Sequence, residues 1–94
     1  MVSTFETFEA QFSLSNQPNP FGDFTQIVVA SQVQGDFQFV VTDLLGRVVL
    51  RQPVELFEGE NTIDFNGSQL AEGLYIYAIT NGRQAVSSKM IVNR

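Results

Sequence analysis

Residues 70–92, LAEGLYIYAITNGRQAVSSKMIV, contain two runs of β-forming residues separated by the dipeptide Asn81-Gly82. Asn-Gly between two such runs is the strongest short-range signal for a β-hairpin, and a type I′ turn requires positive φ at both of its central residues. We therefore expect residues 73–80 and 84–92 to form two paired antiparallel strands, joined by a type I′ turn.

The beginning of the same stretch indicates which kind of β fold contains this hairpin. Leu70-Ala71-Glu72-Gly73-Leu74-Tyr75 places a leucine, a tight turn and a tyrosine at the entry to a strand. This is the layout of the tyrosine corner of immunoglobulin-like β-sandwiches, in which the tyrosine hydroxyl bonds to backbone upstream. The sequence predicts this bond for Tyr75.

The chain before the hairpin predicts five more strands. Phe8, Ala10, Phe12 and Leu14 alternate with polar residues, as on one face of a strand. A helix is the alternative there, because Ser3-x-x-Glu6 resembles a capping box and Phe5, Phe8 and Phe12 share a helical face. Further β-rich runs cover residues 24–32, 36–42, 47–52 and 60–65, separated by turn residues at 34–36, 43–46, 53–59 and 66–68.

Seven short strands at regular spacing indicate an all-β, antiparallel β-sandwich with an immunoglobulin-like, fibronectin-like arrangement. If the strand at 73–80 is strand F of that arrangement, one sheet holds the first, second and fifth strands. The other sheet then holds the fourth, third, sixth and seventh. The predicted domain covers residues 8–94, and residues 1–7 are interpreted as a linker remnant or an added start.

Asp43-Leu44-Leu45-Gly46 fits a type I turn with aspartate first and a left-handed glycine last, followed by a hairpin bulge. Arg47 is then the first residue past the bulge, where the backbone redirects a side chain. The chain has only five cationic residues among 94, so the presence of one of them at this position needs an explanation. One hypothesis is an outward arginine that forms a cationic face with Lys89 for a partner, and the other is a salt bridge within the chain.

Composition excludes several functions. Ten acidic and five basic residues give a net charge of −5, so we expect no nucleic-acid partner. The absence of His and Cys removes the usual general base, thiol nucleophile and soft metal ligands. No apolar run approaches the ~20 residues of a membrane-spanning helix. The nine phenylalanines are the expected core of one domain.

Glu55, Glu58 and Glu60 surround Gly59 and raise the question of a calcium loop or a catalytic carboxylate pair. A calcium loop needs six or more oxygen ligands, usually with an Asp-rich spacing that is missing here. A glycosidase needs a cleft that 94 residues hardly supply. We therefore expect no enzyme activity, no catalytic residue, no metal and no cofactor.

Four segments stand in a distinctive order: Pro18-Asn19-Pro20-Phe21, Asp43-Leu44-Leu45-Gly46-Arg47-Val48, Leu70-x-x-Gly73-Leu74-Tyr75 and Lys89-Met90-Ile91-Val92. Over about residues 12–94 the chain resembles the type A C-terminal sorting domain of the type IX secretion system. Such domains are β-sandwiches at the end of proteins exported by certain Gram-negative bacteria. One departure is Gln17, where the family usually has an aromatic residue.

The resemblance implies a non-catalytic C-terminal signal domain. It implies that a fused N-terminal cargo crosses from the periplasm through the outer-membrane translocon to the cell surface or the exterior, and that a surface sortase then removes the domain. It further implies recognition by translocon and sortase at Pro18, Asn19, Pro20, Gly46, Arg47, Gly73, Tyr75, Lys89, Ile91 and Val92.

Structural explanations compete with these assignments, because prolines stop strand pairing, Gly46 suits its turn and Tyr75 suits its corner.

The alternative function is a carbohydrate-binding or adhesive module of a secreted enzyme. A module of that kind usually exposes aromatic side chains on one face, and this chain has no Trp and two Tyr.

Overall fold

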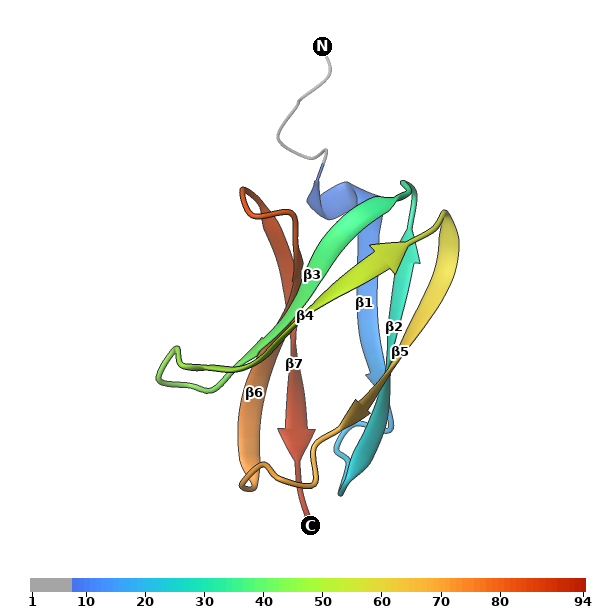
Figure 1. The fold of residues 1–94 in the computed structure, drawn as a ribbon. Coiled ribbons are helices and arrows are strands. Elements are labelled where there is room, and N and C mark those ends of the chain that lie inside the picture. The colour runs from blue at the N-terminus through green and yellow to red at the C-terminus, as the bar shows by residue number, and fades with distance from the viewer. Residues whose placement is uncertain (1–7) are drawn as a thin grey trace.

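The computed structural model describes residues 8–94 as a β-sandwich of seven antiparallel strands in two sheets (Figure 1). A short 3-10 helix, η2 (Glu9–Gln11), precedes the first strand. The strands are β1 (Phe12–Gln17), β2 (Phe24–Ser31), β3 (Gly35–Thr42), β4 (Val48–Leu56), β5 (Gly59–Asn66), β6 (Gly73–Thr80) and β7 (Ala85–Val92). The predicted all-β sandwich of seven strands is confirmed.

The strand order is β1-β2-β5 in one sheet and β4-β3-β6-β7 in the other. Both orders agree with the arrangement predicted from the tyrosine corner. In the larger sheet, the central strand β3 pairs with β4 from Gly35↔Leu56 onward and with β6 from Gln38↔Thr80 onward. The register shifts between Val41 and Thr42, which is the bulge expected beside the β3–β4 turn.

The core lies between the sheets and follows the period-two pattern of the strands. Ile27 and Val29 of β2 belong to this core together with Phe39 and Val41 of β3, and all four are fully buried. The rings of Phe39 and Phe65 pack edge to face at 6.2 Å across the two sheets. Of the nine phenylalanines, Phe8, Phe12, Phe21, Phe39 and Phe65 belong to the buried core.

The start of the first strand was predicted too early. Residues 9–11 form a 3-10 turn, in which Gln11 N donates to Phe8 O at 3.1 Å, and the strand begins at Phe12. The turn places the rings of Phe8 and Phe12 4.9 Å apart, so that both are buried. An extended chain would separate positions four apart by about 13 Å. The helical alternative also used Ser3, Phe5 and Glu6, which lie outside the described residues.

The predicted loop at 53–59 was too long, because β4 continues through Pro53 to Leu56. β4 is at the edge of its sheet, so the missing N–H of proline removes no ladder bond from a central strand. Leu56 is fully buried and provides a reason to extend the strand. Phe57 and Glu58 alone connect β4 to β5.

The β6–β7 hairpin is confirmed, but its turn is not type I′. Gly82 has a φ of 94°, and within the described residues only glycines have positive φ, so Asn81 does not satisfy the type I′ requirement. Instead the Asn81 side chain accepts hydrogen bonds from Arg83 N and Gln84 N, each at 2.9 Å. The strand therefore resumes at Ala85, opposite Thr80.

No helix in the described part of the chain has the length and apolar character to cross a membrane.

Candidate recognition site

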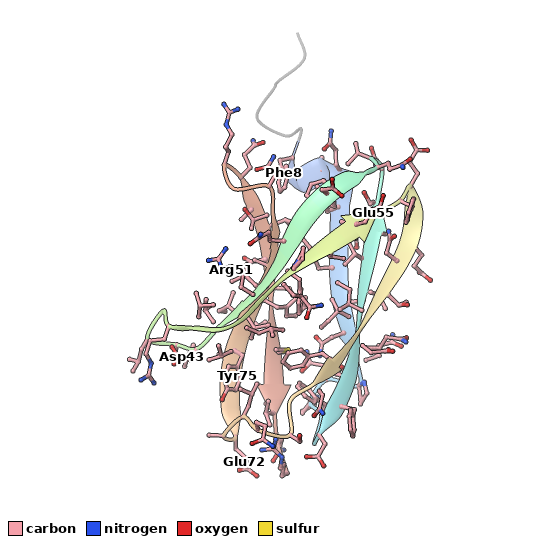
Figure 2. All side chains as sticks on the ribbon, in the orientation of Figure 1. Phe8, Asp43, Arg51, Glu55, Glu72 and Tyr75 are labelled. Atoms are coloured by element: carbon pink, nitrogen blue, oxygen red, sulfur yellow. The ribbon has the colours of Figure 1, made fainter. Side chains whose placement is uncertain are left out.

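Tyr75 forms the predicted corner. Its hydroxyl donates to the carbonyl oxygen of Ala71 at 2.7 Å, and the residue is 7% exposed. β6 then runs antiparallel to β7, with Gly73 opposite Val92 and Tyr75 opposite Met90. The corner therefore fixes the loop before β6 at the same end of the sandwich as the end of β7 (Figure 2).

The loop that follows β1 binds the edge of β7. Asn19 Oδ1 accepts from Ile91 N at 3.0 Å, and Asn19 Nδ2 donates to Lys89 O at 3.4 Å. Phe21 continues this contact through its backbone, because its N–H donates to Ile91 O at 3.0 Å and its carbonyl accepts from Asn93 N at 2.8 Å. The side-chain amide of Asn19 thus satisfies backbone groups that an edge strand otherwise leaves exposed.

Pro18 and Pro20 lie on either side of this contact, and both are exposed. The peptide bonds that precede them are cis. Phe21, directly after Pro20, is buried and packs its ring edge to face against Phe65 at 6.2 Å. The proline-bracketed motif is therefore anchored by its asparagine and its phenylalanine, while its two prolines face solvent.

Arg94 joins the β1–β2 loop to the β5–β6 loop at the same end of the molecule. Its Nε lies 2.9 Å from Asp23 Oδ1, and its backbone N–H donates to Glu72 Oε2 at 2.9 Å. The guanidinium also donates to the backbone carbonyls of Gly67 and Leu70. Sequence reasoning missed this residue. The available signal was the rarity of cations in the chain and the nearness of Arg94 to the motif of the last strand.

A second group that sequence reasoning missed is polar and buried. Asn16 occupies an inward position of β1 and is 6% exposed. It accepts a hydrogen bond from the Tyr77 hydroxyl at 3.3 Å and donates to Thr25 Oγ1 at 3.3 Å. Thr25 in turn donates to Pro18 O at 2.8 Å, so the network holds the start of the proline motif. Burial raises the pKa of the Tyr77 phenol above its usual range.

The turn between β3 and β4 agrees with the sequence prediction. Gly46 N donates to Asp43 O at 3.0 Å, which closes the type I turn, and Gly46 has a φ of 85°. Asp43 Oδ1 accepts from Leu45 N and Arg47 N, each at 2.9 Å. These backbone bonds, above all the one from Arg47, together with the Arg47 side chain, hold the pKa of the Asp43 carboxyl below its usual value.

Arg47 combines features of both hypotheses for it. Its side chain is 74% exposed, yet Nε pairs with Asp43 Oδ2 at 2.8 Å. It does not lie beside Lys89: Val48, Thr42, Ile76 and Lys89 form one row across the sheet, from one edge strand to the other. Three strand spacings separate these edges, about 14 Å. The two cations therefore occupy opposite edges of the larger sheet.

The ten predicted recognition residues thus form two groups. Eight lie at the end of the sandwich where β7 finishes: Pro18, Asn19, Pro20, Gly73, Tyr75, Lys89, Ile91 and Val92. Gly46 and Arg47 lie apart, on the projecting β3–β4 hairpin marked by Asp43 in Figure 2. Tyr75 and Val92 are buried, whereas Ile91 is 41% exposed.

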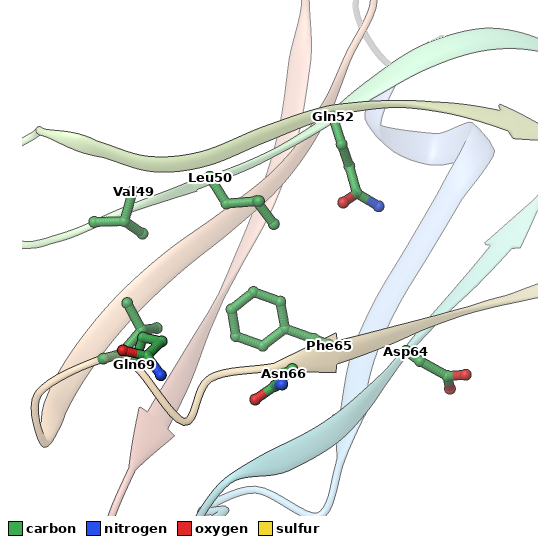
Figure 3. A pocket seen from close by; sticks show the side chains of 8 residues that line it. Val49, Leu50, Gln52, Asp64, Phe65, Asn66 and Gln69 are labelled. Carbon is green, nitrogen blue, oxygen red and sulfur yellow. The ribbon is translucent and has the colours of Figure 1, made fainter.

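The surface of the sandwich has several cavities. One of about 350 Å³ opens between β4 and the β5–β6 segment, with Leu50 and Phe65 facing each other across it (Figure 3). Asp64 is the single acidic group in its lining, and its side chain points away from the opening. Among residues 8–94, no three His, Cys, Asp or Glu side chains are grouped to hold a metal ion.

Residues 17–93 match the model of one protein family, the secretion system C-terminal sorting domain. The match spans the proline motif, both hairpins and the end of β7. The chain belongs to this family. It therefore carries a sorting domain, which is a signal that directs a protein to a secretion system.

No curated protein matches the chain. Similar solved structures include crystal structures of a β-glucosidase from Listeria innocua in complex with glucose (18% identity, TM-score 0.46) and of a mutant in complex with laminaribiose (20% identity, TM-score 0.46). In each case the match covers 88% of this chain and 16% of the glucosidase chain. Similarity at this level has no bearing on function.

Proposed function

We propose that residues 8–94 act as a folded, non-catalytic targeting signal for the type IX secretion system. In this proposal the domain carries an N-terminal cargo from the periplasm through the outer-membrane translocon, and a surface sortase then removes it. Residues 1–7 are assigned, in the same proposal, to a linker remnant or an added start. The observation that carries the proposal is membership of the sorting-domain family over residues 17–93.

The hydrogen bonds at the end of β7 support recognition of a folded surface. Asn19, Phe21 and Arg94 connect segments 70 to 72 residues apart in sequence, so this arrangement forms only in the folded domain. Pro18, Pro20, Lys89 and Ile91 are exposed there and are available to a partner. We assign direct contact to these four, and a supporting role to the buried Tyr75 and Val92, together with Gly73, which faces Val92.

The test is a fusion of residues 1–94 behind a periplasmic reporter, expressed in a host that has a type IX secretion system. We expect the reporter outside the cell or on its surface. The matched control is the same fusion in a strain that lacks a functional translocon, where the reporter stays in the periplasm. A stable, folded fusion retained in the periplasm of the competent strain contradicts the proposal.

A further inference from the structure

Exposed apolar side chains concentrate on the β3–β4 hairpin. Seven large apolar side chains are exposed in the described part of the chain, and four of them belong to this hairpin: Leu44, Leu45, Val48 and Val49. Leu44 is 66% and Leu45 is 78% exposed, at the two central positions of the turn. The hairpin extends away from the body of the sandwich (Figure 1), so neighbouring strands do not cover its tip.

The tip is also held in one conformation. The Asp43 carboxylate accepts three hydrogen bonds, from Leu45 N, Arg47 N and Arg47 Nε. The backbone adds Gly46 N to Asp43 O and Asp43 N to Arg47 O, both at 3.0 Å. A surface that is already ordered loses little conformational entropy when it binds, which favours insertion into a shaped pocket.

Charge argues for a protein partner over a lipid surface. The one cation of the tip, Arg47, is paired with Asp43, so the tip carries no net charge. The whole chain carries −5, which opposes binding to anionic lipid. The Arg47 side chain is 74% exposed, and the bond to Asp43 uses Nε, which leaves the two outer nitrogens facing solvent for a carboxylate of a partner.

We propose that the β3–β4 hairpin is a plug that inserts Leu44 and Leu45 into an apolar pocket on a protein of the translocon, with Arg47 against a carboxylate at the rim of that pocket. This deepens the proposed function and rests on it. The proposal adds two apolar contact residues, Leu44 and Leu45, to the predicted recognition residues Gly46 and Arg47. It also makes this hairpin a second contact surface, separate from the end of β7.

The test uses the double variant Leu44→Ser/Leu45→Asn. Both residues suit the central positions of a type I turn, so the melting transition should stay unchanged. We expect at least a tenfold weaker affinity of the domain for the detergent-solubilised translocon, and a matching loss of reporter export. The control is Phe24→Thr/Phe57→Ser, which removes two side chains that are 65% and 51% exposed elsewhere. It should bind and export normally.

The outcomes separate the two proposals. If the unaltered fusion is exported and the double variant is exported and bound equally well, the plug is refuted while the sorting function stands. Failure of the unaltered fusion refutes both. In another outcome the domain binds vesicles of phosphatidylcholine and phosphatidylglycerol through Leu44 and Leu45, while the double variant keeps its affinity for the translocon. That result refutes insertion into a protein pocket. Dimerisation that the double variant abolishes, again with unchanged affinity, assigns the tip to a second copy.

Discussion

Asn19 uses one side-chain amide to hold the β1–β2 loop against β7. Replacing it by alanine removes the acceptor for Ile91 N and the donor to Lys89 O. Both backbone groups then depend on water, so we expect Asn19→Ala to lower the free energy of unfolding by about 1 kcal/mol in urea denaturation. Gln34→Ala, an exposed change in the β2–β3 turn, should change it by less than about 0.5 kcal/mol. Equal effects of the two variants contradict this assignment.

Arg94 joins loops that the sheets alone do not connect. Arg94→Ala removes the Asp23 pair and the bonds to the carbonyls of Gly67 and Leu70. Since the side chain is 30% exposed, solvent screens part of this loss, and we expect a cost of about 1–2 kcal/mol in thermal unfolding. Arg83→Ala, on the exposed β6–β7 turn, is the matched arginine control and should have almost no effect.

Tyr77 gives the fold a predictable sensitivity to alkali. Burial raises the folded-state pKa of its phenol above the unfolded value near 10. The neutral phenol therefore contributes stability that is fully present below pH ~10 and is lost as the pH rises through the folded-state pKa. We expect Tyr77→Phe to cost about 1 kcal/mol at pH 7, because Asn16 loses a donor. The variant should also show a smaller loss of stability between pH 9 and 11 than the unaltered domain.

At the scale of elements, the β3–β4 hairpin depends on the left-handed glycine at its end. A Cβ on Gly46 would meet no atom within 4 Å, so the cost of Gly46→Ala comes from its φ of 85° alone. We expect a destabilisation of about 1 kcal/mol by chemical denaturation. Gly22 also has open space around it, and its φ is not in the left-handed region, so Gly22→Ala is the control and should be neutral or slightly stabilising.

Two predicted strand boundaries were wrong. Phe8 was predicted to begin a strand, but burying it beside Phe12 requires a tight turn. Pro53 was predicted to end a strand, but it lies on an edge strand, where a missing N–H is tolerated. In both cases the deciding factor was the position of the segment relative to the other sheet or to the sheet edge, which local sequence does not specify.

For the whole molecule, the positions of Arg47 and Lys89 predict how their effects combine. Both side chains are exposed, so alanine at either position should leave the melting transition nearly unchanged, with at most about 1 kcal/mol lost. We expect each change to lower reporter export. Because about 14 Å separates the two edges of the sheet, the two losses in export free energy should add. Normal export of the double variant refutes a role for these cations, and a strongly non-additive loss refutes two separate contacts.

The sequence by itself determined the number of strands, their order in the two sheets, the tyrosine corner and the type I turn at Asp43 to Gly46. These features depend on local signals: alternation, turn chemistry, and a motif whose members lie within a few residues of one another. The order and spacing of four such motifs also indicated the family. The predicted recognition residues could be named in this way, although the sequence did not show which of them lie together.

The tertiary structure alone decided that grouping. Asn19 meets Lys89 and Ile91 across 70 and 72 residues of sequence, and Arg94 meets Asp23 across 71. It also placed Asn16 and Tyr77, 61 residues apart, in one buried network, and it separated Arg47 from Lys89. Hydrogen bonds of this kind depend on distance and angle between groups that only the closed sandwich brings together. The periodicity of the sequence does not predict these hydrogen bonds, because it indicates which face of a strand a residue occupies and not which residue lies opposite it.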